Sequence, residues 1–159
     1  DSLSILPYVD SKHLLDVGAG AGLPSIPLAI CLPDLQVMAI DAVQKKVSFM
    51  RQVKAELGLT NFSVIHGRIE EQSVTENGIS NQFDTITSRA FSELGLFIKL
   101  TRHLLKDDGK WLAMKGVIPE HEFKKSGIKP TEVKVLRVAE LAAERHLVII
   151  NKQELENNK

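Results

Sequence analysis

The sequence predicts an α/β fold: a mostly parallel seven-stranded sheet with helices on both faces and a C-terminal antiparallel strand pair. Three observations carry this prediction. The apolar stretch from Leu14 to Val17, interrupted only by Asp16, is typical of a buried parallel strand and runs directly into three glycines at alternate positions. Strand-like and helix-like segments then alternate along the chain. Two strand-like segments, Thr131–Val138 and Leu147–Ile150, close the sequence.

The composition is that of a globular protein, which we expect to form a single domain over residues 1–159. Hydrophobic residues make up 43% of the chain, and twenty basic residues balance twenty acidic ones. This balance lacks the basic excess that is common in nucleic-acid-binding proteins. The one cysteine, Cys31, offers no disulfide framework, and no apolar run approaches the roughly 18 residues that span a bilayer. We therefore expect a cytoplasmic protein without a membrane segment.

Apolar periodicity and turn residues place the elements of the first half. They predict a short helical run at Ser2–Val9, a strand at His13–Val17, a helix at Pro24–Cys31, a strand at Leu35–Ile40, a helix at Val43–Leu57 ended by Gly58, a strand at Phe62–His66 and a loop at Gly67–Glu70.

The same signals place the second half. They predict a loop at Thr75–Gln82, a strand at Phe83–Thr87, a helix at Ser92–Leu105 that buries Leu96 and Ile98, a tight turn at Asp107–Gly109, a strand at Lys110–Met114, a short helix at Pro119–Lys125, the two closing strands and a frayed polar tail from Lys152.

The glycine turn is the most informative motif. Asp16, Gly18, Gly20 and Gly22 form an acid-x-Gly-x-Gly-x-Gly pattern between the first strand and the first helix. The dinucleotide-binding pattern needs its third glycine later, where Ser25 stands, and no Lys-Ser or Lys-Thr pair follows to make a phosphate-binding loop. The spacing is typical of S-adenosylmethionine (SAM) methyltransferases, although a purely structural turn in another α/β protein remains an alternative.

Two further segments lie where such a fold binds adenosine. Asp41 ends the second strand, 23 residues after Gly18, where an acid can accept the ribose hydroxyls. The alternative role for Asp41 is N-cap of the following helix. Ile69 and Glu70 follow the third strand, where they could cover the adenine ring and accept from its amino group, or simply form a surface turn.

The segment after the fourth strand limits which classes of methyl acceptor the protein could use. It contains Ser88-Arg-Ala-Phe91, without the Asn/Asp-Pro-Pro-Tyr/Phe pattern that orients an exocyclic amine. Cys31 is misplaced for the thiolate that carbon-5 methylation of a pyrimidine needs. An acceptor with its own lone pair remains, such as a purine ring nitrogen or a small-molecule oxygen or nitrogen. It needs no general base, and the basic residues Arg68, Arg89 and Lys115 suit it.

Several longer motifs resemble one family, the bacterial 16S ribosomal RNA guanine-N7 methyltransferases, also called glucose-inhibited division protein B. They are, in order, Asp16-Val-Gly-Ala-Gly-Ala-Gly-Leu-Pro24, Ile26-Pro-Leu28, Arg51-Gln-Val53, Arg68-Ile-Glu-Glu71, Ser88-Arg-Ala-Phe91, Lys115-Gly116 and Glu144-Arg-His-Leu-Val148. The resemblance runs from Asp1 to about Asn151. It implies the class I SAM-dependent methyltransferase (Rossmann-like) fold and SAM-dependent methylation of N7 of a guanine in the 530 loop of 16S rRNA.

The resemblance also implies roles for particular residues. Cofactor-binding positions are Asp16, Gly18, Gly20, Gly22, Leu23, Asp41, Ile69, Glu70 and Arg89; Arg89 and Lys115 are the catalytic candidates, and Arg145 is a weaker RNA-contact candidate. No metal is expected. The chain departs from the family at Ser25, where glycine is common, and we expect the family's N-terminal helical segment to be missing from it. The expected partner is 16S rRNA or the 30S subunit, and the expected state is a monomer.

Two other functions stay open on the sequence alone. A small-molecule methyltransferase of the same fold agrees with the zero net charge. A non-catalytic SAM-binding module would bind the cofactor without transferring its methyl group. RNA binding that weakens steeply with salt distinguishes the rRNA enzyme from both.

Overall fold

The structure, a computed structural model, describes residues 2–71, 82–89, 93–137 and 144–157. Within them seven strands form one sheet in the order β3-β2-β1-β4-β5-β7-β6. The strands are β1 (His13–Val17), β2 (Gln36–Asp41), β3 (Phe62–His66), β4 (Phe83–Ser88), β5 (Leu105–Lys115), β6 (Glu132–Arg137) and β7 (Glu144–Asn151). The first five pair in parallel, and β7 pairs antiparallel with both β5 and β6.

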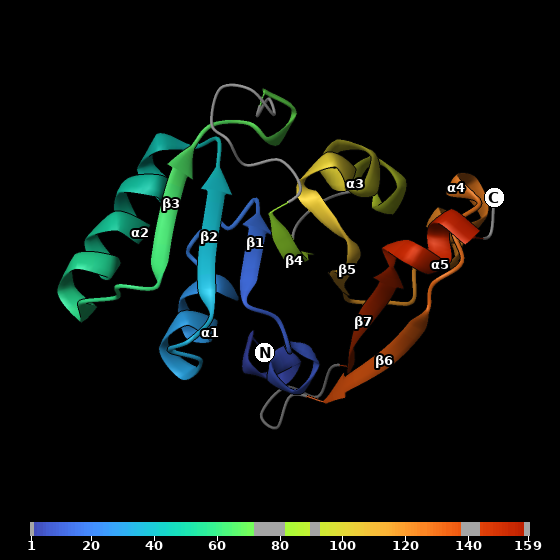
Figure 1. Cartoon of the computed structure of the whole chain (residues 1–159), viewed down its shortest axis with the longest axis horizontal. Coiled ribbons are helices and arrows are strands. Elements are labelled where there is room, and N and C mark those ends of the chain that lie inside the picture. Colours follow the sequence, from blue (N-terminus) through green and yellow to red (C-terminus); the bar gives the residue numbers. More distant parts are fainter. Residues whose placement is uncertain (1, 72–81, 90–92, 138–143, 158–159) are drawn as a thin grey trace.

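Helices cover both faces of this sheet. They are η1 (Ser2–Tyr8), α1 (Ser25–Cys31), α2 (Gln44–Leu57), η2 (Ile69–Glu71), α3 (Leu94–Thr101), η3 (Arg102–Leu104), α4 (Glu120–Ser126) and α5 (Lys152–Asn157), where η marks a 3₁₀ helix. In Figure 1, β3 and α2 lie at one end of the sheet, and β6, β7 and α5 lie at the other.

The core has two halves because neighbouring strand residues point to opposite faces. Leu14 packs with η1, α1 and α2, whereas Leu15 packs with α3 and the apolar side chains beyond it. Trp111 of β5 is fully buried in the second half, and its indole N–H donates to the hydroxyl of Thr101 at 2.9 Å. The buried N–H group is therefore satisfied by a hydrogen bond, as buried polar groups in folded proteins usually are.

The strand order reverses between β1 and β4, which lie side by side in the sheet. In sheets of this kind ligands bind in the crevice outside the carboxyl ends of the strands at the reversal. The glycine turn follows β1 and Arg89 follows β4, so the predicted site residues meet at this edge.

Several predictions for the second half were wrong. The predicted helix Ser92–Leu105 is shorter: α3 covers Leu94–Thr101, η3 follows, and Leu105 already opens β5. Leu96 is 41% exposed, and Phe97 takes the buried position instead. The predicted tail is α5, held because the ammonium of Lys152 donates to the carbonyls of Arg102 and Leu105 at 3.0 and 2.7 Å.

The predicted tight turn at Asp107–Gly109 belongs to β5 and is a bulge in it. The strand pairs Leu105 with Phe83 and then Lys110 with Thr85, so the residues between are left out of the register. Gly109 fits there because a Cβ would lie 2.8 Å from the carbonyl oxygen of Asp84. The predicted loop Thr75–Gln82 lies, except for its last residue, outside the described residues.

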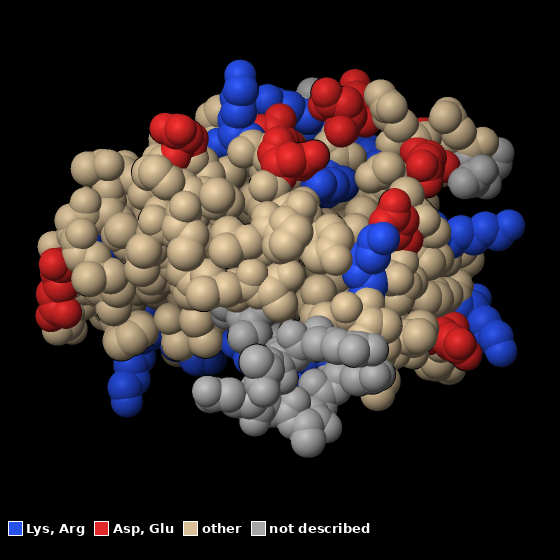
Figure 2. Space-filling view, turned by 90° about the horizontal axis from the view of Figure 1, so that it is seen from below, with Lys and Arg blue, Asp and Glu red and all other residues tan. Residues whose placement is uncertain are grey.

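The surface reflects the balanced composition. Figure 2 shows one face of the molecule on which basic and acidic side chains are interspersed around a largely uncharged middle. Among the described residues, no helix is long and apolar enough to cross a membrane.

Candidate functional site

The glycine turn bends the chain away from β1 and back toward β2. Gly18, Gly20 and Gly22 all have positive φ, at 67°, 59° and 83°, a conformation that glycine adopts without steric cost. The N–H groups of Gly18 and Ala19 donate to the carbonyl of Ile40 at 2.9 and 3.2 Å. At Gly22 a Cβ would lie 2.2 Å from the Cδ1 of Ile26, so the turn packs directly on α1.

Asp41 fastens the turn to the end of β2. One carboxylate oxygen accepts the N–H of Gly20 at 2.8 Å, and the other accepts the N–H of Val43 at 2.9 Å. The N-cap of α2 is Val43, so Asp41 holds the turn before the helix and is not its cap. The side chain is largely buried, and each carboxylate oxygen can accept a further bond.

A cavity of about 300 Å³ opens beside Asp41, at the carboxyl ends of β1 and β2. Its lining is Val17, Gly18, Ile40, Asp41, Ala42, Gly67, Arg68, Ile69 and Glu70. Apolar walls with a buried carboxylate at one side suit a planar base joined to a sugar. Larger hollows exist elsewhere among the described residues, and one of them is polar and lies at the opposite ends of β1, β4 and β5, away from the glycine turn.

Four predicted cofactor residues line this cavity: Gly18, Asp41, Ile69 and Glu70. The side chain of Ile69 is buried against β1 and β2, as a base-covering residue requires. Glu70 is exposed and lies 3.9 Å from the guanidinium of Arg68. Gly20, Gly22, Leu23 and Asp16 lie outside the lining.

Asp16 lies behind the turn in full burial. Neither of its carboxylate oxygens has a hydrogen-bond partner among the described residues, and neither does the hydroxyl of Ser25. Burial raises the pKa of Asp16 from 3.8 to about 8, while the polar groups of Ser25 oppose the rise. The charges of Asp41 and Arg89 also act on it, in opposite directions, so these three predicted residues lie within electrostatic reach of one another.

Arg89 and Lys115 lie at the ends of neighbouring strands. Ser88 pairs with Ala113, so Arg89 lies one residue and Lys115 two residues beyond this pair, at the same edge of the sheet. Arg89 is exposed at the surface of this edge. Lys115 is largely buried, and its ammonium lies 3.1 Å from the carboxylate of Glu122 in α4. The other basic candidate, Arg145, is half-buried near the start of β7, two strands from β4.

Sequence reasoning missed three parts of this site. Val17, Ile40 and Ala42 form cavity walls, yet in the sequence they are ordinary strand and turn residues. The pairing of Lys115 with Glu122 has no sequence signal, because an acid in the first turn of a helix is commonplace. The position of Ser25 opposite Asp16 was marked only by its departure from glycine.

Comparison with known proteins assigns the family. The model of the GidB family, described as rRNA small subunit methyltransferase G, matches residues 1–148. A relative named ribosomal RNA small subunit methyltransferase G from Methylobacillus flagellatus is 57% identical over 150 residues, which cover 94% of this chain and 71% of the relative. The protein of the same name from Chromobacterium violaceum is 50% identical, over 93% of this chain and 70% of its own length.

Solved structures agree on the fold. A putative SAM-dependent methyltransferase from Methanococcus maripaludis superposes with a TM-score of 0.69 at 18% identity, over 91% of this chain and 79% of its own. A SAM-dependent methyltransferase from Aquifex aeolicus gives 0.61 at 22% identity, over 87% and 80%. The predicted class I SAM-dependent methyltransferase fold is confirmed, and so is the predicted resemblance: the chain belongs to the GidB family of rRNA small subunit methyltransferase G proteins.

Proposed function

We propose that this chain, as a single domain over residues 1–159, transfers the methyl group of SAM to N7 of a guanine in the 530 loop of 16S rRNA. The family match over residues 1–148 is the observation that carries the proposal. The motifs that resemble the guanine-N7 enzymes supply the position of the methyl group, and the cavity beside the glycine turn supplies the place for the cofactor.

The residues at the cavity fit SAM. Asp41 has acceptor capacity left for the two ribose hydroxyls, since each oxygen now accepts one N–H. Ile69 covers the adenine ring, and Glu70 lies beside it. Gly18 and Gly20 leave open space where a Cβ would stand, so a ligand can approach the backbone. Gly22, Leu23 and the buried Asp16 complete the proposed cofactor set by shaping the turn.

The acceptor side needs little from the protein beyond position and charge. Bound SAM supplies a methyl group that its sulfonium already activates. The N7 lone pair of guanine takes that methyl group directly, so no side chain has to remove a proton. Arg89 and Lys115, at the ends of β4 and β5, orient the guanine and its phosphates by charge and hydrogen bonding. This division places the cofactor over β1 and β2 and the acceptor over β4 and β5.

The test is methyl transfer from labelled SAM to 30S subunits and to free 16S rRNA, both from a strain without the modification. Label mapped to N7 of a 530-loop guanine is the expected result, and a preference for one substrate identifies the partner. We expect a monomeric cytoplasmic enzyme whose RNA affinity falls with salt. SAM binding without label on either RNA would refute the proposal in favour of a small-molecule enzyme or a non-catalytic module.

A further inference from the structure

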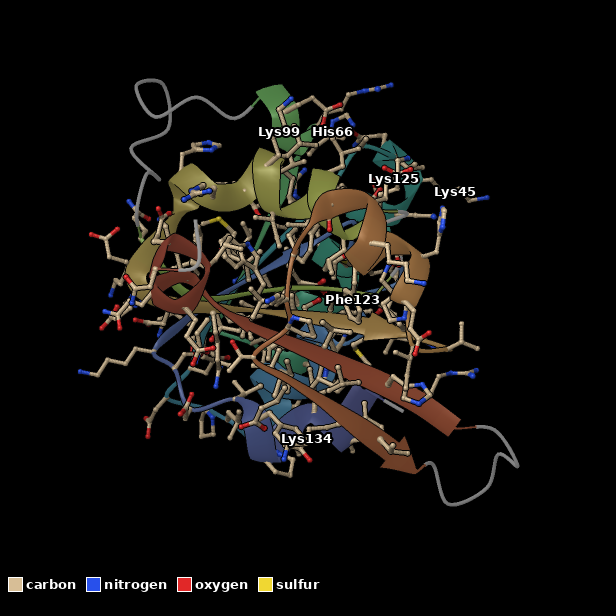
Figure 3. All side chains as sticks on the ribbon, turned by 90° about the vertical axis from the view of Figure 1, so that its right-hand side faces the viewer. Lys45, His66, Lys99, Phe123, Lys125 and Lys134 are labelled. Carbon is tan, nitrogen blue, oxygen red and sulfur yellow. The ribbon has the colours of Figure 1, made fainter. Side chains whose placement is uncertain are left out.

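Helix α4 is fastened to the first turn of α3 at three points. One carboxylate oxygen of Glu122 accepts the N–H of Leu94 at 2.8 Å. The ammonium of Lys125 lies 3.0 Å from the carboxylate of Glu93. Gly95 and Ser126 are in close contact, because a Cβ on Gly95 would lie 3.1 Å from that of Ser126. Figure 3 shows α4 beside α3, with Phe123 beneath it on the side of the sheet.

Glu122 joins this contact to the catalytic edge of the sheet. The oxygen that accepts the N–H of Leu94 also lies 3.1 Å from the ammonium of Lys115. Both charged side chains are largely buried, with 16% of Lys115 and 19% of Glu122 exposed. A charged pair at this depth is costly to break, because removing one partner takes a close opposite charge from a largely buried group.

This junction lies beside the segment that carries Arg89. The start of α3 is five residues after Arg89, and Lys115 ends the neighbouring strand. Glu122 therefore connects the chain on both sides of the proposed acceptor site. The cofactor cavity shares none of these residues, since its lining comes from β1, β2 and the segment after β3.

We propose that Glu122 is a positioning residue for methyl transfer. One of its carboxylate oxygens holds Lys115 and the first turn of α3 in place relative to each other. This contact sets the geometry in which the acceptor meets the cofactor. The proposal rests on the function proposed above and assigns Glu122 to the acceptor side of that site. Glu122 itself contacts neither substrate nor cofactor.

The variants are Glu122→Ala, Glu122→Gln and the matched control Glu120→Gln, an exposed acid in the same turn of α4. The amide of E122Q still presents an oxygen to the N–H of Leu94 but loses the charge opposite Lys115. We expect kcat to fall about 10- to 100-fold in E122A and less in E122Q, as loss of charge-assisted hydrogen bonds predicts. E120Q should stay within about twofold of the wild type, and the SAM dissociation constant should stay within about twofold in all three.

A second measurement does not depend on the RNA. Hydrogen exchange should speed up in E122A at the start of α3, around residues 93–97, and stay unchanged at the cavity-lining segments 17–18 and 40–42. Equal kcat for E122A and E120Q, or unchanged exchange at the start of α3, would overturn the proposal. Loss of SAM affinity in step with kcat would overturn it too, because that pattern marks general destabilisation. Failure of the wild type and E120Q to label either RNA would instead refute the proposed function, while the exchange data still decide whether Glu122 holds the start of α3.

Discussion

Replacing Asp16 by asparagine should make the protein more stable at neutral pH. Asp16 is fully buried, and both of its oxygens lack hydrogen-bond partners among the described residues. Burial raises its pKa from 3.8 to about 8, so at pH 7 the folded protein holds a proton that the unfolded chain releases. Asparagine has the same shape and carries no charge at any pH in this range.

The pKa gives the sign and the size of the effect. Because the pKa of Asp16 is higher in the folded state, the contribution of this one group to stability is greatest below pH 3.8 and falls as the pH rises toward about 8. Each pH unit in that window costs about 1.4 kcal/mol of the free energy of unfolding. Roughly three pH units separate 3.8 from neutral pH, so the cost at pH 7 is on the order of 4 kcal/mol as an upper figure.

The assay is urea unfolding of the wild type and D16N at several pH values between 5 and 8.5. Subtracting one free energy of unfolding from the other cancels the contributions of all other titrating groups, which the two proteins share. We expect the free energy of unfolding of D16N, relative to that of the wild type, to rise steadily with pH, by about 1 to 4 kcal/mol across the series. Asp34→Asn, at an exposed position, controls for the loss of one acid from the surface. A difference that stays flat between pH 5 and 8 would refute the reasoning.

Three further substitutions test the site. Arg89→Ala should lower kcat/KM for methyl transfer about 10- to 100-fold while the melting temperature stays within about 2 °C, since the residue is exposed; wild-type turnover in this variant would contradict its role. Asp41→Ala should weaken SAM binding by about 1.5–3 kcal/mol in calorimetry. It should also destabilise the fold, because two backbone N–H groups lose their acceptor. Unchanged SAM affinity would exclude the ribose assignment. Gly22→Ala should lower the free energy of unfolding by about 2–4 kcal/mol, because the φ of Gly22 is positive and a Cβ would overlap Ile26. Gly116→Ala, where a Cβ would meet open space, should be nearly neutral. Equal effects of the two substitutions would contradict the packing argument.

The sequence predicted the parts of the fold whose signals are local. The strand that contains Leu14 and Leu15 and the glycines that follow it depend on residue type over a few positions, and both lie where they were expected. The element order, and with it the parallel sheet and the closing antiparallel pair, followed from alternating apolar periods. The errors came where a long-range contact outweighs local propensity. The polar tail forms α5 because Lys152 finds two carbonyl acceptors on a distant segment.

The candidate site divides in the same way. The sequence alone determined the glycine turn and the acid at the end of the second strand, because glycine is required there by backbone geometry and the acid accepts two backbone N–H groups. Only the tertiary structure decided which groups are paired. Folding buried Asp16 completely, which raises its pKa, and it set Glu122 between Lys115 and the N–H of Leu94. Those pairings depend on which side chains the packed sheet and helices bring together, and no sequence pattern within a single segment predicts them.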